Sequence, residues 1–494
     1  MYWTIPHIRC RILPSEWEEE YIDTNDAMIS SYIHLEVQLA LSTSSVSQYA
    51  VRRATTVTVL ALAWPAIVDQ FLSMAVNMVD TAMVGRLGAA ALAAVGLGAQ
   101  IMMTATAIFT SISTGTTALI ARHIGAGQPQ EAHQVARQSI VAGLGLSVLC
   151  SICFVVFAHQ IVHVMFGNAE VDVLADAAGY VRIIGAAVVP QFILVICNSI
   201  LRGAGDTRTP MKVMAVSNVF NVIGNYLLIF GVGPFPRLGV FGAALSTALS
   251  HVVGGVIQVY IIFRGRRLIQ LNWRDDWAPH FATIKRILTI GIPAGLEQGF
   301  MRVGQLLFTM ILSGLGTIAF AAHRIALQAE SLSFMPGFGF ALSATTLVGQ
   351  ALGAGDAKAA ERNGMEATRL AAIGMSAMGV LFFLFPKPLV SVFTTDQSVI
   401  EQSAVVLRIV ALSQPFLALH MVLAGSLRGA GDTRTVMAVT AIGVCAIRVS
   451  LAYLLVRLGF GLVGAWIAMS VDLVTRGLLL FIRFRSGRWK HVHV

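Results

Sequence analysis

Twelve long apolar segments alternate with short polar connections along this chain. The first six lie near residues 58–84, 92–120, 138–158, 179–201, 210–231 and 240–263. The second six lie near residues 284–312, 320–350, 367–386, 404–427, 436–457 and 462–482. A helix needs about 20 apolar residues to cross the hydrocarbon core of a bilayer. We therefore predict twelve transmembrane helices.

The two sets of six segments are copies of one architecture. The stretch Leu-Arg-Gly-Ala-Gly-Asp-Thr-Arg-Thr occurs at 201–209 and again at 427–435. Shorter matches recur at nearly the same offset, since Pro65-Ala66 and Asp69-Gln70 correspond to Pro293-Ala294 and Glu297-Gln298. A repeat of this length is half of a protein and not a solenoid unit.

Each nine-residue stretch has the composition of a tight helical hairpin. Its glycines end one helix, its Asp can cap the next, and Pro210 falls in a first helical turn. Four arginines mark the two hairpins: Arg202, Arg208, Arg428 and Arg434. We expect them to hold the tips at a cytoplasmic lipid surface, with direct substrate contact as the alternative.

Composition supports a polytopic membrane protein. The 494 residues are 56% hydrophobic and only 12% charged, with a mean hydropathy of +0.75, which is too apolar for a soluble chain. The 45 glycines suit close helix packing. The net charge of +9 comes from short connections and does not indicate nucleic acid. Four of the five cysteines lie inside apolar segments, so we expect no disulfide and no metal cluster.

The distribution of Lys and Arg sets the orientation. These residues concentrate in alternate connections and near both ends of the chain, whereas six lie on the opposite side. Both termini are therefore expected in the cytoplasm, with the protein in the cell membrane. An even number of spans per half gives the two halves the same orientation, related by a pseudo-two-fold axis along the membrane normal.

This orientation divides the chain into five parts. Residues 1–50 are polar, lack a signal-peptide layout, and are expected to be a disordered extension or an artefact of the start codon. The expected lobes are 51–263 and 284–482. A basic cytoplasmic connection, 264–283, joins them, and 483–494 form a basic tail.

Polar residues form stripes along two helices of the first half. At about 100° per residue, span 1 has one stripe of five side chains: Asp69, Gln70, Ser73, Asn77 and Asp80. Span 5 has another: Ser217, Asn218, Asn221 and Asn225. Hydrogen bonding between helices explains such stripes for serine, but an ionisable Asp80 within a span is a functional candidate.

The second half repeats only part of this pattern. Glu297, Gln298 and Gln305 replace the acid and amides of span 1, but Phe308 stands in place of Asp80. In span 8, His323 and Glu330 share one face and form either a buried pair or part of a pocket for a cationic substrate.

Span 12 contains two charged residues, and two further arginines lie in other spans of the second half. Asp472 and Arg476 are four residues apart, and we expect them to neutralise each other. The sequence offers no partner for Arg302 or Arg448.

Three motifs carry a family resemblance. They are Val79-Asp80-Thr81, the two Leu-Arg-Gly-Ala-Gly-Asp-Thr-Arg stretches, and Glu330-Ser331-Leu332-Ser333-Phe334-Met335-Pro336-Gly337-Phe338-Gly339. Over residues 55–485 the chain thus resembles the multidrug and toxic compound extrusion (MATE) family. The resemblance implies an all-α polytopic fold, a V of twelve transmembrane helices in two six-helix lobes. It also implies export of cationic or amphipathic drugs in exchange for sodium or protons.

The family's cation site maps onto one cluster of this chain: Asp80, Tyr180, Asn221, Asn225 and Thr247. A sodium ion would lie at Asp80, Asn221 and Asn225. Many relatives have Asp where this chain has Asn225, and an acid near the position of Leu417. A sodium-coupled branch places its span 7 Glu deeper than Glu297. The coupling ion, H+ or Na+, therefore stays open.

The leading functional prediction is a secondary active antiporter that exports organic cations or amphipathic drugs. We expect its substrate cavity to be lined by seven polar residues: Asp69, Gln70, Asn77, Glu297, Gln298, Gln305 and Glu330. The expected protein is a monomer in the lipid bilayer that needs no cofactor besides its coupling ion.

The sequence supports three other classes of function less well than it supports an antiporter. A flippase for lipid-linked precursors is the alternative within the superfamily and would need a cavity rich in Arg and Lys. A membrane enzyme would need a motif of clustered acids or histidines. A nucleotide-driven pump would need a glycine-rich phosphate-binding loop. The sequence contains neither motif.

Overall fold

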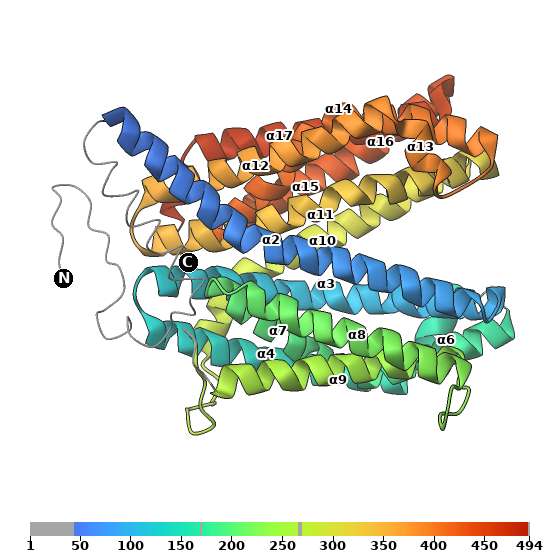
Figure 1. Ribbon diagram of the computed structural model, residues 1–494, viewed down its shortest axis with the longest axis horizontal. Coiled ribbons are helices and arrows are strands. Elements are labelled where there is room, and N and C mark those ends of the chain that lie inside the picture. The colour runs from blue at the N-terminus through green and yellow to red at the C-terminus, as the bar shows by residue number, and fades with distance from the viewer. Residues whose placement is uncertain (1–43, 168–169, 265–268, 493–494) are drawn as a thin grey trace. The chain divides into compact units, whose positions relative to one another are not determined.

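The computed structural model describes residues 44–167, 170–264 and 269–492, and every regular element in these ranges is helical. The first half contains α2 (Ser44–Gly85), α3 (Ala89–Gly125), α4 (Pro129–Val156), α5 (Ala158–Phe166), α6 (Val171–Ala186), α7 (Val188–Gly203), α8 (Arg208–Phe230) and α9 (Val240–Arg264). The second contains α10 (Phe281–Ser313), α11 (Thr317–Gly353), α12 (Ala357–Leu384), α13 (Pro386–Ser391), α14 (Gln397–Gly429), α15 (Thr433–Ala441), α16 (Val449–Leu455) and α17 (Gly461–Arg485). Two π-helical segments, η3 (Ile442–Arg448) and η4 (Val456–Phe460), flank α16, and the short 3-10 helix η5 (Arg488–His491) follows α17 (Figure 1).

These helices account for the twelve predicted spans. Seven single helices are long and apolar enough to cross a membrane. Two bent units also are: α3 is one of them, and α6 with α7, whose axes meet at 52°, form the other. The helical stretch Thr433–Arg485 also passes this test, and it is two spans because Gly459 and Gly461 break it with positive φ angles. α10 is the twelfth span, and its charged side chains explain its lower hydropathy. The protein is therefore an all-α, multi-pass membrane protein with twelve spans.

The amino-terminal boundary differs from the prediction. α2 begins at Ser44, before the expected lobe boundary at residue 51, because the helix continues into polar residues that hydropathy does not count. The chain divides into two compact units between Thr58 and Val59, within α2. The predicted disorder concerns residues 1–50, of which 1–43 lie outside the described ranges.

The two nine-residue repeats form helical hairpin tips. Gly205 and Gly431 have φ angles of 95° and 87°, a conformation that costs glycine little. In the first tip, Asp206 accepts from the backbone N–H of Thr209 at 2.9 Å, which confirms the predicted cap. In the second, Asp432 precedes α15, but its oxygens accept from the Thr435 hydroxyl and from Arg483.

The first helix of each half packs partly against the other half. Ser343 on α11 donates to the backbone oxygen of Val59 on α2 at 3.1 Å, and Gly339 on α11 lies against Ile67. In the same way, Ile287 and Ile290 on α10 belong to the apolar core of the first half. The sequence divides the chain between 263 and 284, whereas in space α2 and α10 each contact both sets of helices.

Helices α3 and α11 come into backbone contact at their carboxyl ends. A Cβ at Gly125 would overlap the carbonyl oxygen of Gln350, and a Cβ at Gly353 would overlap that of Arg122. Gly125 and Gly353 are repeat-related positions, so each glycine admits the backbone of the other helix. The amide of Gln350 also donates to the carbonyl oxygen of Gly203 at 3.3 Å.

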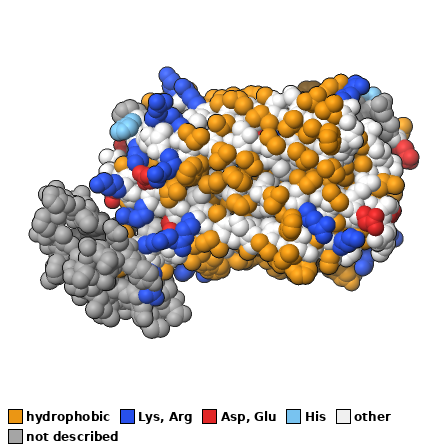
Figure 2. Space-filling model, turned by 90° about the horizontal axis from the view of Figure 1, so that it is seen from above, with side chains coloured by type: hydrophobic (Ala, Val, Ile, Leu, Met, Phe, Trp, Pro, Cys, Tyr) orange, Lys and Arg blue, Asp and Glu red, His pale blue; other side chains and the backbone are white. Residues whose placement is uncertain are grey.

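The surface carries the polarity expected of a membrane protein. On the face that Figure 2 shows, hydrophobic side chains cover the middle, and many Lys and Arg side chains gather at one end. Many large apolar residues on this and other faces are exposed, including Leu149, Val256 and Met310. Such an apolar belt suits contact with lipid.

Candidate functional site

Asp80 on α2 lies in a cluster of amides from α8. The Nδ2 of Asn225 donates to Oδ1 of Asp80 at 2.6 Å. Asn225 also lies 3.3 Å from the Oδ1 of Asn221, one helical turn earlier on the same face of α8. Asn221 in turn lies 3.2 Å from the hydroxyl of Thr247 on α9. Three helices therefore bring four of the five predicted cation-site residues together.

The amide of Asn221 fits its neighbours in two orientations. In one, its nitrogen donates to Thr247 and its oxygen accepts from Asn225. In the other, its nitrogen lies 3.2 Å from both carboxylate oxygens of Asp80, and its oxygen accepts from Thr247. The second orientation satisfies more groups and gives Asp80 a second amide donor.

One acceptor in the cluster has no partner. Oδ1 of Asn225 is buried and makes no hydrogen bond within the described part of the chain. Buried polar atoms are rarely left unsatisfied. Together with the oxygens of Asp80, Asn221 and Thr247, it supplies a set of hard donors that suits a small cation.

Tyr180, the fifth predicted residue, lies on α6 within electrostatic range of Asp80. Its ring packs against Gly98 of α3, where a Cβ would overlap it. Tyr180 is buried, and no hydrogen bond joins its hydroxyl to Asp80 in the described part of the chain. Groups of three or more His, Cys, Asp or Glu side chains with metal-binding geometry are absent from the described ranges.

The acids that begin the polar stripes are paired with arginines. Asp69 on α2 accepts from Arg202 at 2.9 Å. At the repeat-related position, Glu297 on α10 accepts from Arg428 at 2.6 Å and 3.3 Å. Both acids are almost fully buried, with 5% and 3% of their surfaces exposed. Arg202 and Arg428 thus have buried carboxylate partners that the sequence did not indicate. Their expected contact with a lipid surface, or with substrate, stays a prediction.

Each of these two ion pairs joins two sequence motifs that are repeated in the halves of the chain. Arg202 and Arg428 belong to the nine-residue stretches, and Asp69 and Glu297 each lie four residues after the matched proline. Each pair therefore holds the first helix of one half to a hairpin tip.

The remaining predicted cavity residues are not gathered around Asp80. Asn77 is exposed and donates to the backbone oxygen of Ser73. Gln70 and Gln298 are half-buried, and Gln305 is exposed. Glu330 is buried on α11, and its Oε1 is unpartnered within the described residues.

His323 and Glu330 form no hydrogen bond with each other in the described ranges. The ring of His323 instead makes edge contacts with Phe308 and Trp466, at 5.7 Å and 5.8 Å between centroids. The simple buried pair of His323 and Glu330 is therefore not formed.

The second half contains a buried charge network that is larger than the single ion pair predicted from the sequence. The predicted pair of Asp472 and Arg476 is confirmed at 2.8 Å. Asp472 also pairs with Arg448 at 2.7 Å, and Arg476 contacts His420 at 2.9 Å. Arg448 thus has the partner that the sequence could not supply, because the two residues lie on different helices, 24 positions apart.

The second half has no counterpart of the Asp80 cluster. Phe308 occupies the repeat position of Asp80, and the guanidinium of Arg448 lies 5.9 Å from its ring centroid. Arg448 ends the π-helical segment η3, and such segments shift the side chains that follow by about one position. The acid–amide site therefore exists in the first half of the chain.

Comparisons with known proteins agree with this architecture. The MatE family model matches residues 65–227 and 293–454. A probable multidrug resistance protein NorM of Thermotoga maritima is 35% identical over 87% of this chain and 92% of its own length. An uncharacterised transporter of Bacillus subtilis, YisQ, is 30% identical over 88% of this chain and 95% of its own length.

Solved structures show the same likeness. A MOP superfamily transporter of Pyrococcus furiosus, described as having a binding pocket of reversed polarity, matches with a TM-score of 0.82 and 25% identity, over 87% of this chain and 95% of that one. An outward-facing multidrug resistance MATE family transporter matches to the same extent. With the two copies of the family model falling on the two halves of the repeat, the chain belongs to the MatE family, the multidrug and toxic compound extrusion transporters.

Proposed function

We propose that this protein is a secondary active multidrug efflux antiporter that exports organic cations or amphipathic drugs in exchange for H+ or Na+. Its family and the name of its Thermotoga relative support multidrug efflux. The observation that carries the coupling is the single carboxylate of Asp80, held by Asn225 inside an otherwise neutral polar cluster.

The chemistry of the cluster fits one monovalent ion at a time. Asp80 provides one negative charge, and its neighbours Asn221, Asn225 and Thr247 provide neutral oxygens. A proton on Asp80 or a sodium ion beside it gives a neutral site, whereas loss of either leaves an anion whose burial is costly. The loaded and empty cluster are therefore two states that favour different conformations.

The amides can adjust to either state. With the site empty, Asn221 and Asn225 both present nitrogens to the carboxylate of Asp80. With a sodium ion bound, rotation of each amide would present its oxygen instead, including the unpartnered Oδ1 of Asn225. A proton would need no such rotation, so the two ions leave distinguishable arrangements.

For the substrate, we propose a cavity lined by polar side chains of α2, α10 and α11. Four neutral amides there, Gln70, Asn77, Gln298 and Gln305, offer hydrogen bonds without fixing one ligand shape. Three acids, Asp69, Glu297 and Glu330, provide the attraction for a cation. Asp69 and Glu297 are neutralised by arginines, so a cationic drug would gain their charge by opening a pair. We further propose a monomer in the cell membrane with both termini in the cytoplasm.

The flippase alternative is disfavoured by the arginines. A pyrophosphate substrate requires several uncompensated cations in the cavity. Four arginines within or at the ends of spans are already paired with acids: Arg202, Arg428, Arg448 and Arg476.

Purified protein in proteoliposomes tests the proposal. A proton gradient and a sodium gradient are imposed separately, and uptake or release of a cationic dye is followed together with the flux of each ion. The proposal predicts that one gradient drives the dye and that the dye gradient drives the same ion in reverse. Dye movement that is indifferent to both gradients would rule out ion-coupled antiport.

A further inference from the structure

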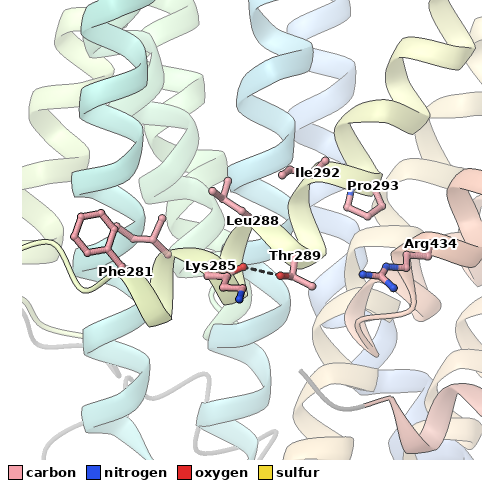
Figure 3. Close-up of a pocket in the computed structure, with 8 residues that line it drawn as sticks. Phe281, Lys285, Leu288, Thr289, Ile292, Pro293 and Arg434 are labelled. Atoms are coloured by element: carbon pink, nitrogen blue, oxygen red, sulfur yellow. Dashed lines mark hydrogen bonds between the residues drawn. The ribbon is translucent and has the colours of Figure 1, made fainter.

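A cavity of about 620 Å³ lies between the start of α10 and the first turn of α15. Figure 3 shows Lys285 on α10 and Arg434 on the other wall, with Leu288 and Ile292 further along α10. None of the residues that line the cavity belongs to the Asp80 cluster. It opens at the protein surface, where Phe281 is 80% exposed and Ile292 51% exposed.

The two cations of this cavity are uncompensated. Lys285 and Arg434 are exposed and have no ion pair within the described ranges. The acid on α10, Glu297, is paired with Arg428, and Asp432, which precedes α15, is paired with Arg483. Two positive charges therefore converge on one opening without a protein counter-ion.

The rest of the lining is apolar and lies deeper in the membrane. Leu288 and Ile292 follow Lys285 by one and two turns of α10, and Ile292 lies about 10 Å beyond Lys285 at a rise of 1.5 Å per residue. The hydroxyl of Thr289 donates to the backbone oxygen of Lys285 and so adds little polarity. The cavity thus has a cationic mouth and an apolar floor, Leu288 and Ile292, which is itself open to the surface at Ile292.

We propose that this cavity binds one anionic phospholipid from the leaflet on the basic side of the membrane. Its phosphate would lie between Lys285 and Arg434, and an acyl chain would lie along Leu288 and Ile292. Basic pockets between spans on the cytoplasmic side bind the head groups of such lipids. Both cations are on the side of the membrane that carries most of the basic connections.

Other occupants suit the cavity less well. A cationic drug would meet two positive charges at the mouth. A soluble anion would use the cations but leave Leu288 and Ile292 exposed to water. The basic pair is also specific to the second half, because the repeat position of Lys285 is Val57 in the first half.

A lipid bound in this cavity would also affect the stability of the hairpin tip that carries Arg434. The same tip presents Arg428, at the end of α14, to Glu297 of α10, so a lipid that bridges Lys285 and Arg434 would strengthen the existing connection between α10 and this tip. We therefore expect the bound lipid to stabilise the tip against thermal unfolding.

Retention of phosphatidylglycerol by the full-length protein tests the proposal without any transport measurement. Protein purified from nanodiscs that contain phosphatidylcholine and phosphatidylglycerol is examined by native mass spectrometry, and affinity is measured by titration. We expect one tightly held phosphatidylglycerol, and about thirtyfold weaker retention by Lys285→Gln/Arg434→Gln, because each cation near the surface adds roughly fivefold.

Control variants separate charge, shape and folding. Lys285→Arg/Arg434→Lys keeps both charges and should retain the lipid, whereas Ile292→Trp fills the apolar floor and should release it. Lys358→Gln removes an exposed cation from the amino end of α12, at the same membrane side, and should leave retention unchanged. Equal retention by the parent and Lys285→Gln/Arg434→Gln would overturn the proposal. Displacement of the lipid by millimolar glycerol phosphate would also overturn it, because it would show a site for soluble anions.

Discussion

Asp80 is held by neutral groups alone, and this determines how much charge its cluster can carry. Asn225 donates to it at 2.6 Å, and Asn221 and Thr247 complete the polar surroundings. One carboxylate can be neutralised by one proton or one sodium ion. A second carboxylate in contact with the first would change both the affinity and the choice of ion.

Asn225→Asp should therefore give the cluster stronger cation binding. Two adjacent carboxylates are not both ionised without a cation between them, so the pH profile of dye export should move to higher pH and move back when sodium is added. Transport rates against external pH, with and without sodium, provide the measurement. Asn218→Asp adds the same charge two turns away on α8 and should lack the sodium-dependent shift; identical profiles for both variants would contradict the prediction.

The repeat-related ion pairs give a prediction about stability. Asp69→Asn or Arg202→Gln leaves a largely buried partner without its counter-charge, at a cost of about 2 kcal/mol, between the values for exposed and fully buried pairs. The double variant should recover much of that loss because no unpaired charge remains. Thermal unfolding in detergent measures the cycle.

A mismatched double variant provides the control for this cycle. Asp69→Asn with Arg428→Gln removes one residue from each of two separate pairs, so the losses should simply add. Additive losses in the matched variant as well would show that Asp69 and Arg202 do not interact in solution.

The acids within the spans could be identified from the sequence, but the residues that pair with them could not. Asp80 stood out as an ionisable residue within a span, and the family resemblance grouped it with residues of spans 4, 5 and 6. The stripe of Asp69 pointed to a cavity, but helical periodicity gives only the direction of a side chain along its own helix. Arg202 is 133 positions away from Asp69, and pairing across that distance depends on how helices pack, which hydropathy does not specify.

At the scale of elements, the contact between α3 and α11 depends on repeat-related glycines. Gly125 and Gly353 each face a carbonyl oxygen of the other helix, with no space for a side chain. Small residues permit such close approach of membrane helices. The crossing joins the two halves of the repeat at one end of both helices.

Gly125→Ala should loosen this crossing. Its Cβ would overlap the carbonyl oxygen of Gln350, and overpacking of this kind costs about 2 kcal/mol. Gly96→Ala on the same helix has open space around the added Cβ and should leave stability nearly unchanged. The melting temperatures of both variants in detergent check the prediction, and equal melting temperatures would contradict it.

The spans themselves were predicted from hydropathy, but their irregularities were not. All twelve predicted segments correspond to helical spans, because apolar length alone determines a crossing. The 52° bend between α6 and α7 and the π-helical η3 lie within continuous apolar segments, in which hydropathy does not mark a change of helix geometry. The short helices α5 and α13 are likewise too brief to leave a hydropathy signal.

At the scale of the whole molecule, the two halves share a fold and differ in chemistry. The first half contains Asp80 among amides, whereas the second has Phe308 and Arg448 at the related place. We therefore propose that the first half couples ion movement to export. In the second half, Asp472 is paired with both Arg448 and Arg476 and is therefore not available for that role.

Gradient-driven export by Asp80→Asn is the most direct test of this assignment. Parent, Asp80→Asn and the surface control Asp172→Asn are reconstituted at equal density, and export of a cationic dye is measured under imposed proton and sodium gradients. Because Asn preserves the shape of Asp and removes only its change in charge, the variant should fold and bind dye but show no gradient-dependent export, while Asp172→Asn matches the parent. Export by Asp80→Asn that still responds to the driving gradient at the parental rate would contradict the account.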